Sequence, residues 1–234
     1  MIISLAVCLA LLWVIRRAEE FHFSRDTTLD ISLVLMVVGL IGARLFHVLY
    51  ESPNYYSENI LRVFEIWNGG FVFYGGAIPA TLAGIFWAAK KNRGLFKGYL
   101  DLFAPVVSFT YILGRVACFF AGCCYGKQCD LPWAVNGRHP TQIYAVLGEI
   151  GILLLLIYCE RIPPNKRRPA FLGKSGCIFY LWMVLHSFIR FFLEFLRDDN
   201  RGPKFLFSVS GWISLLVFIL GIYFVVKNPQ KLKS

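Results

Sequence analysis

Charge is scarce in this sequence, and negative charge is scarcest. Only 16% of the 234 residues are Asp, Glu, Lys or Arg, whereas about a quarter are charged in an ordinary soluble domain. There is also no low-complexity tract and no convincing internal repeat. What fills the chain is apolar: 57% of the residues are hydrophobic, 17% are aromatic, and the mean hydropathy is +0.60. This composition excludes an ordinary soluble domain and predicts an all-α, polytopic membrane protein.

Seven apolar runs are long enough, or nearly long enough, to cross a bilayer core, which takes roughly 17 to 25 helical residues. We expect them to form a single integral-membrane domain over residues 1–234. The first run lacks the basic start and the small-residue cleavage site of a signal peptide, so we expect a short or tilted span there. The predicted spans are residues 2–15, 29–50, 71–89, 100–121, 141–158, 174–195 and 207–226.

The basic residues alternate between the loops. The loops after the first, third and fifth spans, together with Lys174 at the start of the sixth span and the C-terminal tail, hold 15 Lys and Arg residues, and the other loops hold 6. Because basic residues collect on the cytoplasmic side of a membrane, this bias predicts an N-terminus outside and a C-terminus in the cytoplasm. It also accounts for the net charge of +10 without a nucleic-acid partner. The unusual loops then lie outside, so we expect a site open to the outer leaflet or the periplasm.

Three arginines, Arg44, Arg115 and Arg190, lie inside predicted spans. A charge near the bilayer centre costs a few kcal/mol and usually faces the interior of a helix bundle. In the sixth span His186, Arg190 and Glu194 recur at every fourth residue, on one helix face. One interpretation is an ion pair that only orients the helix. The other is that Glu194 holds Arg190 for a phosphate, and three arginines near one depth favour it.

The stretch 114–144 contains most of the remaining polar signals. It runs from an arginine inside a span through a Gly- and Cys-rich turn to a polar re-entry into the next span. We interpret it as the floor of a site for an anionic, membrane-embedded molecule. Elsewhere, Tyr74, Gly75 and Gly76 open the third span, where the glycines predict backbone lying against a ligand or a neighbouring helix and Tyr74 can donate a hydrogen bond. The small residues within 39–42 predict close helix approach.

Four cysteines lie close together: Cys118, Cys123, Cys124 and Cys129. Their spacing is not the pair of C-x-x-C motifs that zinc sites commonly use, so no metal site is predicted. Cys123 and Cys124 are adjacent and cannot bond to each other without strain. A disulfide from Cys129 to one of them, and a thiol role for Cys123 or Cys124, both stay open.

Six short motifs occur in order along the chain. They are Gly-Leu-Ile-Gly-Ala-Arg at 39–44, the Gly75-Gly76 pair, Asp-Leu-Phe-Ala-Pro at 101–105, Gly114-Arg115 leading to Gly126, His-Pro-Thr-Gln-Ile-Tyr at 139–144 with Glu149, and Arg-Phe-Phe-Leu-Glu-Phe-Leu-Arg at 190–197. Together, over residues 39–201, they resemble the prolipoprotein diacylglyceryl transferases of bacterial inner membranes. The resemblance implies seven spans, phosphatidylglycerol or a related phospholipid as donor, and a lipobox cysteine in a prolipoprotein signal-peptide region as acceptor. Glycerol phosphate is the implied product, and no cofactor is implied.

The resemblance also implies roles for individual residues. Arg115 and Arg190 match the arginines that hold the headgroup phosphate, and Glu194 matches the glutamate that positions the second of them. The expected catalytic set is Arg115, Arg190, Glu194, His186 and Tyr74. The expected substrate-binding set is Arg44, Gly75, Gly76, Gly126, His139, Gln142, Tyr144 and Arg197.

Several positions depart from the family pattern. Tyr74 stands where the family usually has a histidine, and His186 stands where it has a tyrosine. Cys118 replaces an asparagine and Cys123 an acidic residue. The phosphate half of the site is thus kept and the thiol-activating half is changed, which makes His186 or His139 the candidate base. A different acceptor with Cys123 or Cys124 in a covalent role, and a non-enzymatic lipid-binding or transporter-like protein, remain the alternatives.

Overall fold

The computed structural model is built from helices and describes residues 2–90, 93–162, 170–198 and 207–227. Each of the seven predicted apolar runs lies mostly in one long helix, so the all-α prediction is confirmed, and the only β structure among the described residues is a few isolated bridges. The long helices are α1 (Ile2–Glu20), α2 (Arg25–Phe46), α4 (Phe73–Lys90), α5 (Arg93–Phe120), α6 (Thr141–Arg161), α7 (Cys177–Leu196) and α8 (Val209–Lys227).

Five of these helices are long and apolar enough to cross a membrane, namely α2 with its π-helical extension, α5, α6, α7 and α8. The apolar part of α4, Gly75–Trp87, is shorter, and α1 carries charged residues in its last turns. The polytopic prediction is therefore confirmed. The predicted and observed ends differ most at α5, which begins at Arg93 rather than at residue 100.

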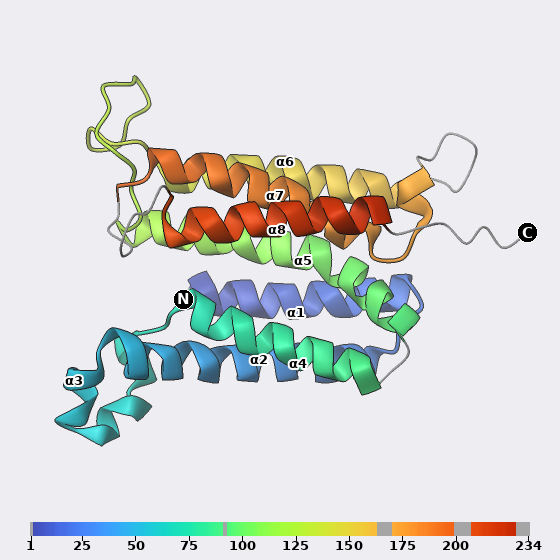
Figure 1. Cartoon of the computed structure of the whole chain (residues 1–234), viewed down its shortest axis with the longest axis horizontal. Coiled ribbons are helices and arrows are strands. Elements are labelled where there is room, and N and C mark those ends of the chain that lie inside the picture. The colour runs from blue at the N-terminus through green and yellow to red at the C-terminus, as the bar shows by residue number, and fades with distance from the viewer. Residues whose placement is uncertain (1, 91–92, 163–169, 199–206, 228–234) are drawn as a thin grey trace, which may run out of the picture. The chain divides into compact units, whose positions relative to one another are not determined.

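The chain divides into two compact units, one of residues 1–14 with 97–234 and the other of residues 15–96. In the smaller unit α2 and α4 lie side by side (Figure 1). A Cβ atom on Gly75 would lie 2.2 Å from the Cβ of Phe46, and one on Gly76 would lie 2.6 Å from the carbonyl oxygen of Gly39. Any larger residue would push the helices apart, which confirms the prediction of close approach through small residues.

The larger unit is organised around α5, α6, α7 and α8 (Figure 1). Its buried core includes Ala104 of α5, Ile152 and Leu156 of α6, and Ile178 of α7. Asp101 of α5 accepts hydrogen bonds from the backbone N–H groups of Gly176, at 2.5 Å, and Phe179, at 3.0 Å. A carboxylate is favourable there because those groups at the start of α7 have no partner within their own helix.

At one end of this unit α5 and α7 end, α6 and α8 begin, and the segment 121–140 extends beyond them (Figure 1). One backbone hydrogen bond closes the segment on itself and another ties it to α7: Gly126 N–H donates to the carbonyl of His139 at 2.9 Å, and Lys127 N–H donates to that of Leu196 at 2.8 Å. A Cβ atom on Gly126 would lie 2.5 Å from the Leu196 oxygen. Glycine is therefore required where this turn crosses the end of α7, and the turn fixes the C-terminal ends of α5 and α7 together.

Candidate active site

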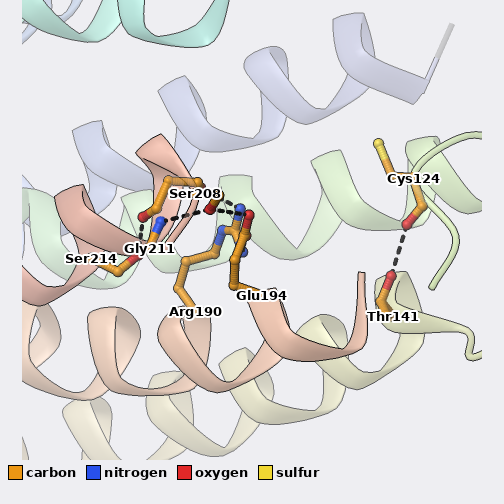
Figure 2. Close-up of polar contacts among 8 residues, drawn as sticks. Cys124, Thr141, Arg190, Glu194, Ser208, Gly211 and Ser214 are labelled. Carbon is orange, nitrogen blue, oxygen red and sulfur yellow. Dashed lines mark hydrogen bonds and ion pairs between the residues drawn. The ribbon is translucent and has the colours of Figure 1, made fainter. Parts of the chain in front are cut away.

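The predicted pair in α7 forms and is held by the start of α8 (Figure 2). Arg190 Nη1 lies 2.5 Å from Glu194 Oε2. The other guanidinium nitrogen, Nη2, donates to Ser210 Oγ at 2.5 Å, and Ser208 Oγ donates to Glu194 Oε1 at 2.5 Å. The two side chains are only 12% and 14% exposed. Both charged groups are thus fixed from two helices, so the direction of the Arg190 guanidinium is set before any ligand arrives.

Sequence reasoning missed Ser208 and Ser210. Ser208 Oγ also accepts the backbone N–H of Gly211 at 3.1 Å and so caps the first turn of α8. A Ser-x-Ser sequence directly before an apolar run is a recognisable helix start. That signal predicts the cap but not the partners, which come from another helix.

A second polar cluster joins α6 to α7. Glu149, 1% exposed, receives Trp182 Nε1–H at 2.9 Å on one carboxylate oxygen and lies 2.8 Å from His186 Nδ1 on the other. The Trp182 and His186 rings also stack, with centroids 5.0 Å apart. A carboxylate only accepts hydrogen bonds while it is ionised, so Nδ1 carries the proton and Nε2 of a neutral His186 presents its lone pair.

The ring of Tyr111 links this cluster to α5. Its centroid lies 4.7 Å from that of His186, edge to face, so these sides of α5 and α7 face each other. The guanidinium carbon of Arg115, one turn further along α5, lies 4.9 Å from the Tyr111 centroid. Arg190 is likewise one turn past His186 on α7. Each arginine lies one turn beyond the Tyr111–His186 contact and on the same side of its helix, so the two arginines are on facing sides of α5 and α7. Because the two helices end together, both arginines lie about 5.4 Å nearer that end than the contact does.

Arg115 differs from Arg190 in its partners. Among the residues that the structure describes, its guanidinium has a cation–π contact with Tyr111 and neither an ion pair nor a hydrogen bond. The five N–H donors of this permanently charged group thus have no acceptor among the described residues and can bind an anion. This is the arrangement expected of an anion-binding arginine.

The turn after α5 brings three thiols together. The sulfur atoms of Cys118, Cys123 and Cys124 all lie within 4.8 Å of one another, and all seven cysteines are free. A hydrogen bond from the Cys118 thiol, followed by one from the Cys123 thiol and the hydrogen bond and charge of Arg197, lowers the pKa of Cys124 to about 4 against the opposing effect of burial. Of the three thiols, Cys124 is therefore the one whose ionised form these contacts favour.

The start of α6 holds this turn in place. Thr141 Oγ1 donates to the carbonyl of Cys124 at 2.7 Å (Figure 2), and Gln142 Nε2 donates to that of Cys123. Gln142 is 1% exposed, and its Oε1 is buried with no hydrogen-bond partner among the described residues. Thr141 belongs to the motif at 139–144 but was not among the expected site residues.

The predicted residues His139 and Tyr144 lie together beyond the turn. His139 Nδ1 is 3.4 Å from the Tyr144 hydroxyl, which accepts the indole N–H of Trp133 at 2.8 Å. Arg138 nearby pairs with Asp198 at 3.1 Å. These contacts form a polar, partly exposed rim at the end of the larger unit.

The remaining predicted residues belong to the smaller unit. Arg44 is 6% exposed, and its five donors are directed at the carbonyl oxygens of Arg62, Val63, Glu65, Gly69 and Gly70. Its guanidinium therefore stabilises the loop before α4, and a phosphate would have to displace those bonds. Gly75 and Gly76 face α2, as described above. Tyr74 lies in α4, but its side chain is outside the described side chains.

The fold and these contacts define an all-helical, multi-pass membrane protein with partly buried arginines on the facing sides of two helices. The sequence profile described as prolipoprotein diacylglyceryl transferase matches residues 1–227. The chain is 32% identical over 235 residues to the phosphatidylglycerol–prolipoprotein diacylglyceryl transferase of Finegoldia magna, covering 99% of this chain and 90% of that protein. The enzyme of the same name from Polynucleobacter asymbioticus is 34% identical, with 91% and 83% covered, and that from Clostridium tetani is 29% identical, with 94% and 88% covered.

The chain belongs to the prolipoprotein diacylglyceryl transferase family, which confirms the resemblance drawn from its motifs.

Proposed function

We propose that this chain transfers the diacylglyceryl group of phosphatidylglycerol to the cysteine thiol of a prolipoprotein lipobox and releases glycerol phosphate. Membership of the family supports the reaction class. The observation that carries the proposal is the pairing of Arg115, which has unused donors, with Arg190, whose direction is fixed, on facing sides of α5 and α7.

In this proposal the two arginines hold the headgroup phosphate. Planar guanidinium groups match phosphate oxygens with paired hydrogen bonds. The reaction breaks the bond between the glyceryl carbon and the phosphate oxygen, so negative charge grows on the phosphate as it leaves. Fixed cations around that oxygen stabilise the charge without reorganising, which is the largest contribution in many enzymes. Glu194 and Ser210 act as positioning residues because they touch Arg190 rather than the lipid.

The acceptor thiol must lose its proton before its sulfur attacks the glyceryl carbon. His186 is the proposed base. Glu149 fixes its Nδ1–H, so Nε2 is the atom that takes the proton, and the buried carboxylate then stabilises the imidazolium. In this proposal His186 and Glu149 activate the thiol in place of the family histidine, whose position is Tyr74 in this chain.

The outer turn and its rim are the proposed docking place for the acceptor peptide. Thr141 and Gln142 hold the carbonyls of Cys124 and Cys123, so the turn presents a fixed surface to an extended lipobox segment. His139, Tyr144 and Arg197 surround the same end of the unit. We place the protein in the bacterial inner membrane with this end toward the periplasm or outer leaflet, as the basic loops favour.

The test is glycerol phosphate release by the purified protein in phosphatidylglycerol micelles, with and without a lipobox peptide. We expect release that depends on the peptide cysteine and that falls at least about 100-fold in Arg115→Gln, in line with the loss of one oxyanion-stabilising donor. A matched control is Arg161→Gln, at the far end of α6. Equal turnover by Arg115→Gln and wild type would refute the phosphate role of Arg115.

A further inference from the structure

Three thiols from two kinds of local structure meet at the outer end of α5. Cys118 lies in the last turn of the helix, and Cys123 and Cys124 lie in the turn that follows. All three sulfur atoms are within 4.8 Å of one another, and the Cys123 and Cys124 sulfurs are 3.5 Å apart. His, Cys, Asp and Glu are the side chains that commonly bind metals, and among the described residues these three cysteines form the group of such side chains that lie close enough to share a metal ion.

The spacing fits coordination by a soft metal. With a metal–sulfur bond of about 2.3 Å, three thiolates around one ion stand about 3.8 Å apart in tetrahedral and about 4.0 Å apart in trigonal geometry. The observed separations bracket those values. The sulfurs therefore need to shift by less than about 1 Å, within the reach of χ1 adjustments.

The turn holds this arrangement at a cost. Cys124 has a backbone φ of +67°, a left-handed conformation that costs a non-glycine residue of order 1–3 kcal/mol and persists only where surrounding contacts enforce it. Those contacts are the hydrogen bonds from Thr141 and Gln142 to the carbonyls of Cys124 and Cys123. Backbone strain stabilised from a neighbouring helix is a recurrent feature of ligand sites.

The charges nearby complement three thiolates. Arg115 acts electrostatically on Cys118 and Cys123, and Arg197 hydrogen-bonds Cys124. A monovalent or divalent metal with three thiolates has a net charge of −2 or −1, and two arginines compensate it.

A disulfide would involve only two of these three cysteines. Two of the three thiols would pair and the third would remain, and the adjacent pair Cys123–Cys124 can close only with strain. A metal ion uses all three. The sequence predicted no metal because it lacks two C-x-x-C motifs; the helix end and the left-handed residue bring together sulfurs that the spacing does not.

We propose that Cys118, Cys123 and Cys124 form a binding site for one soft, thiophilic metal ion of the Cu⁺ or Zn²⁺ class, since thiolate ligands select those ions. The site lies in the outer turn, beside the proposed docking place of the acceptor peptide, and metal binding can be measured without the transfer reaction. Binding releases protons and ties the outer turn to α5.

The test is titration of the reduced, detergent-purified full chain with Cd²⁺, followed by the sulfur-to-cadmium charge-transfer absorbance. We expect saturation at one equivalent per chain, at an intensity expected for three thiolates, and displacement by Cu⁺ or Zn²⁺. Loss of a ligand should weaken binding by more than the about 10–100-fold that outer-shell changes cost, so Cys124→Ser should bind at least about 100-fold more weakly.

Two further variants guard against misfolding. Cys118→Asn and Cys123→Glu install the residue types that the family resemblance implies at these positions, so they should fold and still lose high-affinity Cd²⁺. Cys129→Ser, outside the three-thiol group, is the matched control and should bind as wild type. The proposal is overturned if no saturable band appears, if the three ligand variants bind as wild type, or if Cys129→Ser loses the band as they do.

Discussion

Replacing Arg190 by lysine separates charge from geometry at the phosphate site. The guanidinium uses one nitrogen on Glu194 and another on Ser210, each at 2.5 Å, and its remaining donors are proposed to meet the phosphate. A lysine ammonium is a point charge on a flexible stem and cannot hold that planar set of contacts. Lysine keeps the buried charge, however, so Glu194 is not left without a cation.

The expected loss follows from the contacts. One charge-assisted hydrogen bond is worth about 1.5–3 kcal/mol, so Arg190→Lys should lower kcat about 10- to 150-fold at about 1.4 kcal/mol per decade. Stability should change little. Arg190→Ala, by contrast, removes the cation beside the 14%-exposed Glu194 side chain and should cost about 3–5 kcal/mol of folding free energy.

The assay is peptide-dependent glycerol phosphate release under saturating lipid, with thermal unfolding measured on the same samples. Arg161→Lys, an arginine at the opposite end of α6, is the control and should match wild type. Full turnover by Arg190→Lys would refute the argument from guanidinium geometry. An equal loss in the control would show that the assay reports lipid or detergent effects instead.

Four further outcomes are expected. Ser210→Ala removes one hydrogen bond to Arg190 and should lower kcat several-fold in the release assay without changing expression, whereas an unchanged kcat would remove its positioning role. Glu149→Gln should lower transfer at least about tenfold, because His186 loses the carboxylate that its Nδ1 contacts; wild-type transfer would contradict the proposed base. The pKa of Cys124 is lowered to about 4, so its thiol stays ionised above that pH. In metal-free protein its alkylation, followed by mass spectrometry, should therefore be about as fast at pH 6 as at pH 8, whereas a free cysteine with a pKa of about 8.5 would react nearly 100-fold more slowly at pH 6. Arg44→Ala should lower the melting temperature and speed proteolysis before α4, since five carbonyl groups lose their donor; wild-type melting would show that the loop does not need the guanidinium.

The apolar runs were sufficient to place all seven long helices, because apolar length against scarce charge is a strong signal. The Arg190–Glu194 pair was also predictable, since it lies within one helix at a spacing of four residues. Close approach at Gly75 followed from small residues facing each other on two helices.

Contacts between helices were beyond sequence reasoning. Glu149 meets His186 only because α6 packs on α7, and Ser210 meets Arg190 only where α8 begins. Arg44 was grouped with the lipid-binding arginines because depth in a span was the available criterion. Its partners are backbone carbonyls in a loop, and a pattern of side chains in the sequence does not predict contacts to backbone carbonyls.

The sequence shows four cysteines close together in the chain, but it does not show which of their sulfur atoms meet. Its spacing is uninformative, and the meeting of Cys118 with Cys124 depends on a left-handed backbone at a non-glycine residue. Sequence patterns predict such a conformation at glycine or asparagine and seldom at cysteine.

The central claim is tested most directly by the mass of a lipobox peptide after incubation with the purified chain and phosphatidylglycerol. The account predicts that the cysteine peptide gains one diacylglyceryl group, in step with glycerol phosphate release, and that a peptide with serine in place of the cysteine gains nothing. An unmodified cysteine peptide, despite lipid bound to the protein, would contradict it.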